Sequence, residues 1–97
     1  MPVYINLIKF TSKGIENIKD SPKRVEEAQK LAKAVGGELK KVYYTMGQYD
    51  MVAISESPSN ESMMKAMFIL GSAGAIRTET LVAFSAEKAA EIIKGLP

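Results

Sequence analysis

A strand-turn-strand pattern at residues 41–55 constrains the fold of this 97-residue chain more than any other feature. Val, Tyr, Thr and Ile dominate both flanks of the turn, and these side chains suit a pleated sheet surface. Between the flanks, Gly47 can adopt the positive φ that a tight turn needs, which most other residues adopt only with strain. The pattern predicts a β-hairpin with strands over about residues 38–46 and 49–56.

Two further strands are expected, at residues 2–10 and 75–84. Side chains alternate between the two faces of a strand, and in residues 2–10 both faces are largely apolar. Such a strand suits the centre of a sheet that is covered on both sides. The two faces carry Val3, Ile5 and Leu7 on one side, and Tyr4, Asn6, Ile8 and Phe10 on the other.

Three helices are expected around these strands. Ser21 is expected to cap the first, with Pro22 at the first helical position and two glycines at the end. Ser57 repeats this start ahead of a second helix. That helix is apolar around most of its circumference, so we expect it to be buried on two sides or against a partner subunit. Ser85 is expected to cap a closing helix that packs inward through Ala89, Ile92, Ile93 and Leu96.

The resulting order, β-α-β-β-α-β plus a C-terminal helix, predicts an α+β fold of the ferredoxin-like type, in a single domain spanning residues 1–97. In this plait both long helices cover one face of a four-stranded antiparallel sheet. The other face must then be hidden, because we expect it to carry side chains that are too apolar to leave in water. Packing two such faces together predicts a dimeric α+β barrel. The residues expected on this face include Tyr4, Ile8, Phe10 and Tyr44.

The composition excludes several classes of function. The chain has no Cys, and therefore no disulfide, thiolate nucleophile or zinc ribbon; it has no His, and therefore no Ser-His-Asp triad or proximal-histidine haem. We expect no metal site and no cofactor, although an oxygen-only magnesium site remains open. The 13 basic residues are interleaved with 11 acids, and only two are Arg, which is not the pattern of a nucleic-acid-binding face. With no leader pattern and no apolar run of membrane length, we expect a soluble, cytoplasmic protein.

Asp50, at the start of the second hairpin strand, is the sharpest candidate for a functional side chain. Its carboxylate can brace the hairpin by accepting backbone N–H groups, or it can bind a ligand or act as a base in a dry pocket. Arg77 and Glu79 share one face of the last strand. They form either a surface ion pair or, if that face lines a barrel, a clamp in which Arg77 holds a carboxylate or phosphate. The further candidates for a ligand site are Tyr4, Asn6, Tyr44 and Tyr49.

Three segments resemble the GYD-domain family, small prokaryotic proteins named after a Gly-x-Tyr-Asp hairpin. Gly47, Tyr49 and Asp50 occupy the naming positions, and the resemblance covers almost the whole chain. It implies a dimeric α+β barrel and leaves the biochemical role open. The three segments are residues 15–24, 42–50 and 76–81.

A weaker likeness is to the ligand-binding domain of the feast/famine (Lrp/AsnC-type) regulators, which has a Thr-Gly-x-x-Asp hairpin and a Val-x-x-x-Thr strand. Thr45, Gly47 and Asp50 approximate the hairpin, with Met46 inserted, and residues 75–80 approximate the strand. This likeness implies that the hairpin helps to bind a small effector at a subunit interface. No helix-turn-helix segment precedes the first strand, so DNA binding is not implied.

These observations favour a small homo-oligomeric module that binds or senses a small metabolite at a subunit interface. Two alternatives remain open: a cofactor-free enzyme of the dimeric α+β barrel type, such as a monooxygenase or an isomerase, and a structural assembly protein. No catalytic signature stands in the sequence. An open pocket at a subunit boundary favours binding, an enclosed pocket with a desolvated carboxylate favours the enzyme, and a closed, dry interface favours assembly.

Overall fold

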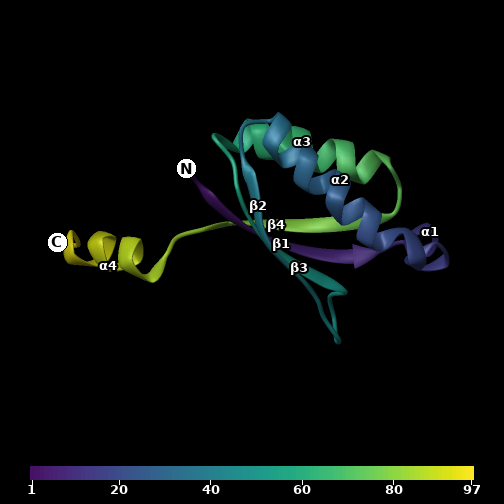
Figure 1. Cartoon of the computed structure of the whole chain (residues 1–97). Helices are drawn as coiled ribbons and strands as arrows, with labels where there is room; N and C mark the ends of the chain where they lie inside the picture. Colours follow the sequence, from purple (N-terminus) through teal and green to yellow (C-terminus); the bar gives the residue numbers. More distant parts are fainter.

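The computed structural model describes all 97 residues as four strands, four α-helices and one short 3₁₀ helix (Figure 1). The elements in chain order are β1 (Val3–Phe10), α1 (Ser12–Glu16), the 3₁₀ helix η1 (Ile18–Asp20), α2 (Ser21–Ala34), β2 (Glu38–Tyr44), β3 (Met51–Glu56), α3 (Asn60–Ser72), β4 (Ile76–Ala83) and α4 (Ala86–Lys94).

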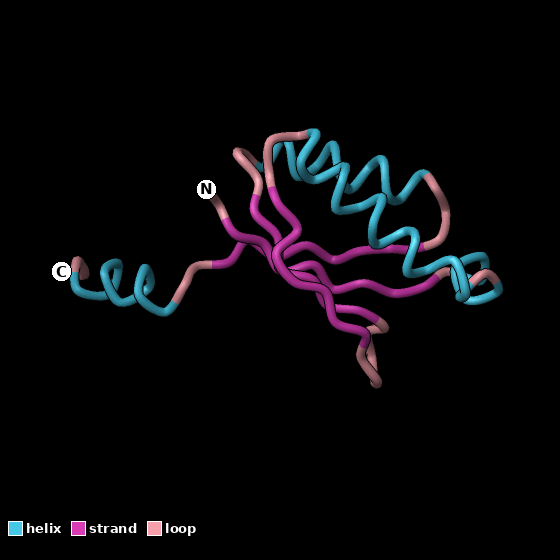
Figure 2. Tube along the Cα trace, viewed as in Figure 1, coloured by secondary structure: helices cyan, strands magenta, loops and turns pink.

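The strands form one antiparallel sheet in the order β2-β3-β1-β4, and α2 and α3 lie on the same face of it (Figures 1 and 2). β1 is a central strand whose Ile5 lies opposite Ile54 of β3 and Leu81 of β4. This arrangement confirms the predicted ferredoxin-like plait. Both edges of β1 are paired, and α2 and α3 cover one of its two apolar faces, whereas the other face is left open.

The hairpin between β2 and β3 has a longer loop than the sequence pattern predicted. β2 ends at Tyr44 and β3 begins at Met51, so residues 45–50 form the loop. The loop is closed by the backbone N–H of Thr45, which donates to the Asp50 carbonyl at 2.8 Å, and by the Thr45 hydroxyl, which donates to the Tyr49 carbonyl at 2.6 Å. Gly47 has the positive φ that was expected, at 111°.

Two of the three predicted helix caps were wrong. Asp20 is the N-cap of α2, and Ser21 is already helical; its hydroxyl instead lies 2.7 Å from the Tyr44 hydroxyl. Ser59 caps α3 by accepting from the Ser62 N–H at 3.1 Å, whereas Ser57 is buried and donates to the Ser59 carbonyl. The hydroxyls of Ser21 and Ser57 are thus engaged with Tyr44 and with the Ser59 carbonyl, and neither caps a helix.

The faces of β1 were assigned the wrong way round. Tyr4, only 1% exposed, and Ile8 lie beneath the helices, not on the open face. The core cluster joins Ile8 to Met51 and Ala53, and Phe10 packs against it. Tyr44 also points toward the helix side, where it meets Ser21. The open face instead carries the alternate positions of the central strands: Val3, Ile5, Leu7, Val52 and Ile54, flanked by Tyr43 and Leu81.

The closing helix α4 was also predicted wrongly, because it does not pack inward. Ser85 caps it as expected by accepting from the Lys88 N–H at 3.0 Å. The helix then extends away from the end of the sheet (Figure 1), and none of its residues is buried. Ile92, Ile93 and Leu96 are 49%, 63% and 64% exposed. None of the helices of the chain has the length and apolarity that crossing a membrane requires.

Candidate functional site

Asp50 ties the hairpin loop to the end of the central strand. Its backbone N–H donates to the Ile8 carbonyl at 2.8 Å, and its carboxylate Oδ2 accepts from the Phe10 N–H at 2.9 Å. β1 ends at Phe10, so this side chain satisfies a backbone donor where strand pairing stops. The contact is the bracing arrangement that the sequence allowed, and it fixes the position of the neighbouring Tyr49.

Tyr49 reaches from the hairpin across the open face of the sheet. Its hydroxyl donates to Glu79 Oε2 on β4 at 2.7 Å, and the Nζ of Lys9 lies 5.4 Å from the centre of its ring. Because β1 runs between β3 and β4, the tyrosine spans the width of the central strand. A shallow hollow of about 220 Å³ lies at this place. We call it the rim site; it is lined by Leu7, Lys9, Tyr49, Arg77, Thr78 and Glu79.

The protonated form of Tyr49 is favoured here. The hydrogen bond to Glu79 is the main reason that the pKa of Tyr49 lies above its ordinary value, and desolvation and the negative charge of Glu79 act in the same direction. Tyr49 is therefore a hydrogen-bond donor, and one oxygen of Glu79 is engaged while the carboxylate keeps further acceptor capacity.

Arg77 and Glu79 do share a strand face, but the ion pair expected between them is absent. The three ion pairs of the chain are Lys40 with Glu38, Lys40 with Glu56, and Lys88 with Glu91. Nη1 of Arg77 instead donates to the carbonyls of Gly71 and Ile76, at 3.1 and 3.0 Å. These bonds hold the guanidinium at the sheet edge through one nitrogen and leave its other donors available to a ligand.

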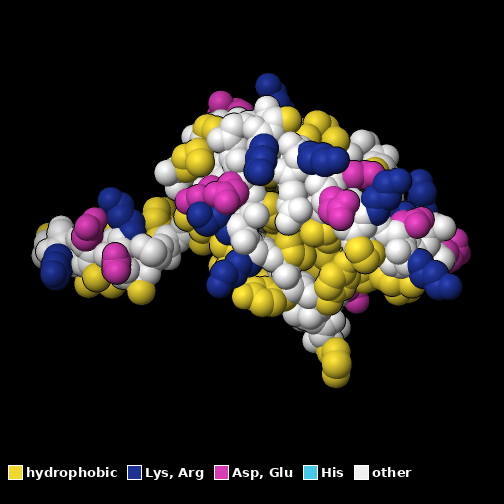
Figure 3. All heavy atoms as spheres, in the orientation of Figure 1, with side chains coloured by type: hydrophobic (Ala, Val, Ile, Leu, Met, Phe, Trp, Pro, Cys, Tyr) yellow, Lys and Arg dark blue, Asp and Glu magenta, His cyan; other side chains and the backbone are white.

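A second, larger cavity of about 300 Å³ lies between the helices and the sheet. Its wall is mostly apolar. Apolar atoms are also visible on the surface below α2 (Figure 3). Asn6 is a buried polar residue in this wall; its Nδ2 donates to Thr80 Oγ1 at 3.0 Å and its Oδ1 accepts from the Ser55 hydroxyl at 2.7 Å. The buried polar side chains of the chain are Asn6, Ser21, Ser55 and Ser57, which are all neutral.

Tyr4 and Tyr44 lie on the same side of the sheet as this cavity but do not line it. The Tyr4 hydroxyl donates to Asn60 Oδ1 at 2.6 Å, at the start of α3, and the Tyr44 hydroxyl meets Ser21 at the start of α2. Each tyrosine therefore pins the first turn of one helix to the sheet. No group of three or more carboxylates comes together in a way that could hold a metal ion.

The candidates from the sequence thus divide between the two faces of the sheet. Tyr49, Arg77 and Glu79 come together at the rim site, with Asp50 behind them in the same loop as Tyr49. Tyr4, Asn6 and Tyr44 lie on the opposite face, so the seven residues cannot form one site. Lys9 was not among the candidates from the sequence. Its position opposite Arg77 in the β1–β4 register is the signal that could have identified it.

This geometry defines a class of protein: a ferredoxin-like α+β domain with an uncovered sheet face and a tyrosine-carboxylate cluster at its rim. The model of the GYD domain matches residues 4–93. The chain belongs to the GYD domain family, which confirms the resemblance noted in its sequence.

A protein of Thermus thermophilus named "Glutamine synthetase and cystathionine beta-lyase binding protein" is 33% identical over 84 residues, which are 86% of this chain and 88% of that protein. The crystal structure of TTHA0845, also from Thermus thermophilus, is 25% identical, with a TM-score of 0.57 over 89% of this chain and 96% of that one.

The fold is also similar to a feast or famine regulatory protein of M. tuberculosis, solved in complex with L-methionine. The TM-score is 0.68 at 14% identity, over 89% of this chain and 52% of the other. This chain therefore spans about half the length of the regulator. At that identity the likeness shows the shared fold alone, as expected for a superfold that hosts many functions.

Proposed function

We propose that this protein is a homo-oligomeric binding module, in which two copies pack through their open sheet faces and a small metabolite binds at the rim of the interface. The observation that carries the proposal is the rim site. Arg77, with unused donors, and Glu79, with unused acceptor capacity, stand beside an apolar sheet face that nothing in the chain covers.

The apolar open face supports the packing of two copies. Its central residues Ile5, Leu7 and Ile54 belong to adjacent strands, and Tyr43 and Leu81 beside them are 52% and 42% exposed. A contiguous apolar patch of this kind is uncommon on the surface of a monomer and marks an interaction site. A second copy of the same face is a suitable cover, because a two-fold axis brings identical patches together and makes the contact self-complementary.

The charges at the rim site favour a small ligand that carries both a positive and a negative charge. The free donors of Arg77 suit a carboxylate, and the carboxylate of Glu79 suits an ammonium group, with the Tyr49 hydroxyl between them. Leu7 provides an apolar contact for a side chain. An amino acid has these groups, and the related fold complexed with L-methionine supports this ligand class.

A protein partner is the second candidate, and a specific surface favours it. The outward side of α3 exposes Met64 and Phe68, at 54% and 69%. Only Met63 and Ala66 of this helix are buried. The wide apolar surface noted in the sequence is therefore covered on the side that faces the sheet and is not covered on the other side. The relative whose name records binding to two enzymes supports a protein-docking role for such a surface.

The enzyme and assembly alternatives have less support. The larger cavity is lined by a buried neutral amide, and its two carboxylates, Glu27 and Glu56, are not buried, so the desolvated carboxylate that would favour a catalytic base is not seen there. A purely structural role would not account for the polar and charged groups of the rim site. A cytoplasmic location remains a prediction from the sequence.

The experiment is a thermal-shift series with free amino acids on the wild type and on Arg77→Gln. We expect at least one amino acid to raise the melting temperature of the wild type, and its N-acetyl or amide derivative to have no effect, because each derivative lacks one charge. Arg77→Gln should remove the response. Arg24→Gln is the matched control, because Arg24 is the other arginine of the chain and lies on the helix side. An equal response in both variants would contradict the rim site.

A further inference from the structure

Helix α4 is too short to be stable by itself and has no packing surface in its own chain. It has nine residues, none buried, whereas isolated helices of fewer than about 12 residues are marginal in water. One stripe along it is apolar, with residues at the three- and four-residue spacing of a packed helix. The stripe consists of Ala89, Ile92 and Ile93 and is continued by Leu96, two residues past the end of the helix. Such a helix needs a surface from outside its own chain to cover this stripe.

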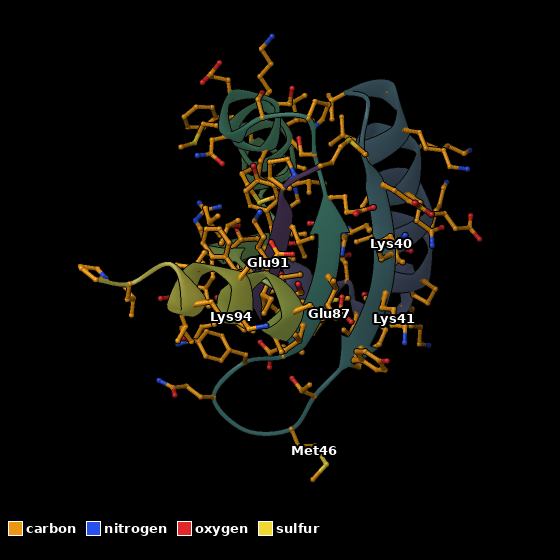
Figure 4. All side chains as sticks on the ribbon, turned by 90° about the vertical axis from the view of Figure 1, so that its left-hand side faces the viewer. Lys40, Lys41, Met46, Glu87, Glu91 and Lys94 are labelled. Atoms are coloured by element: carbon orange, nitrogen blue, oxygen red, sulfur yellow. The ribbon has the colours of Figure 1, made fainter.

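The other side of α4 is suited to water. Glu87 and Glu91 are one helical turn apart, and Lys94 follows on the same side, opposite the apolar stripe. Figure 4, viewed toward this end of the sheet, shows α4 in front of the strands with these three charged residues labelled. The helix is therefore two-sided, and only the stripe is left to pack.

The stripe and the open sheet face are on the same side of the molecule. α2 and α3 lie above the sheet in Figure 1, so the open face is its lower side. In Figure 3 the yellow atoms of α4 gather along its lower edge. A second copy that covers the open face therefore approaches from the side to which the stripe is directed.

The path of the chain keeps α4 away from its own sheet. Only Phe84 and Ser85 connect it to β4, and Ser85 is extended, with φ of −62° and ψ of 158°. The chain measures 52 × 31 × 18 Å, with a radius of gyration of 14.7 Å, whereas a compact domain of this length has about 13 Å. Phe84 is itself 65% exposed.

We propose that α4 is an exchanged arm, which packs its apolar stripe on the open-face side of a second copy of this chain. The inference rests on the dimer of the proposed function and adds the element that holds the two copies together. Each copy gives one arm and receives one, as a two-fold axis requires. The arm is predicted to be helical and ordered only in the dimer.

The first test compares two double variants of the full chain by sedimentation equilibrium. Ile92→Ser with Ile93→Ser removes the stripe while nearly preserving helix propensity, and we expect the dimer dissociation constant to rise about tenfold or more. Glu87→Ser with Lys94→Ser changes the opposite side, and we expect little change. All four residues lie outside the folded core, so the variants should keep the wild-type melting curve.

The outcomes separate this inference from the proposed function. If the wild type is monomeric at every concentration, the dimer itself is wrong and the arm with it. If the wild type is a dimer and the stripe variant dimerises equally well, the dimer stands and the exchanged arm is overturned.

A second measurement tests whether a second copy covers α4. Because the chain has no Cys, Leu96→Cys provides a unique site for a polarity-sensitive fluorophore. We expect its emission to shift to the blue with the same concentration dependence as dimerisation. A blue shift that is already complete in the monomer would place α4 on its own chain, and no shift at any concentration would mean that a second copy does not receive it. Either result would overturn the proposal.

Discussion

The Tyr49 hydroxyl donates a hydrogen bond of 2.7 Å to Glu79 Oε2, although β1 lies between the hairpin that carries the tyrosine and the strand that carries the glutamate. The contact passes over Lys9, whose ammonium lies 5.4 Å from the ring centre. It joins the hairpin loop to the opposite edge strand on the face that the helices leave open. The rim site is therefore built by tertiary structure and not by a local sequence motif.

This hydrogen bond predicts a pH dependence of stability at alkaline pH. The pKa of Tyr49 is raised on folding above its ordinary value of 10.0. The contribution of this hydrogen bond to the free energy of unfolding is therefore complete below about pH 10, and it is lost as the pH rises through the folded-state pKa. The free energy of unfolding of wild type minus Tyr49→Phe should be constant at neutral pH and fall above about pH 10. Tyr43→Phe is the control, because the Tyr43 hydroxyl makes no hydrogen bond. A difference that does not change with pH would show that the bond is not formed in solution.

Replacing Asp50 should weaken the hairpin even without ligand. Asp50→Asn replaces a charged acceptor of the Phe10 N–H with a neutral one, and we expect the free energy of unfolding to fall by about 1–3 kcal/mol. Asp20→Asn is the control, because the Asp20 side chain makes no capping hydrogen bond, and its effect should be small. Urea denaturation of both variants measures this. An unchanged stability in Asp50→Asn, with loss of the amino-acid response, would instead assign Asp50 to ligand binding.

Two glycine substitutions should act in opposite directions. A Cβ on Gly14 would collide with the carbonyl of Ala75, which is held by a hydrogen bond from Thr11, so Gly14→Ala should cost about 1–3 kcal/mol. A Cβ on Gly71 in α3 would meet nothing within 4 Å, so Gly71→Ala should stabilise the protein by about 0.5–1 kcal/mol. Thermal or urea unfolding of the two variants gives both signs. Destabilisation by Gly71→Ala would show that α3 packs more tightly there than described.

The order of the elements could be predicted because it depends on local patterns. The pattern of residues 2–10 predicts a central strand, and Gly47 predicts a hairpin. Both patterns depend on residues that are neighbours in the sequence. The choice of which face of β1 the helices cover was not predictable in this way. Both faces are apolar, and Asn6 looks unsuitable for burial until Ser55 and Thr80, far away in sequence, supply its hydrogen-bond partners.

The rim site was only partly predictable for the same reason. The strand period places Arg77 and Glu79 on one face, but it does not show that the Glu79 carboxylate accepts from Tyr49 and that the Gly71 carbonyl accepts from the guanidinium. The pattern of α4 likewise indicates that its stripe is to be covered, but not by which surface. Long-range partners decide these contacts, and no sequence window contains both sides of them.

The most direct test of the central claim, that the open sheet face joins two copies of the chain, is sedimentation equilibrium of the wild type at micromolar concentration beside Ile54→Lys. Ile54 pairs with Ile5 at the middle of that face and lies away from the helix-side core. We predict a mass of twice the 10.6 kDa chain for the wild type, and a folded species of one chain mass for Ile54→Lys. A wild type with the mass of a single chain, or a variant that remains a dimer, would contradict the claim.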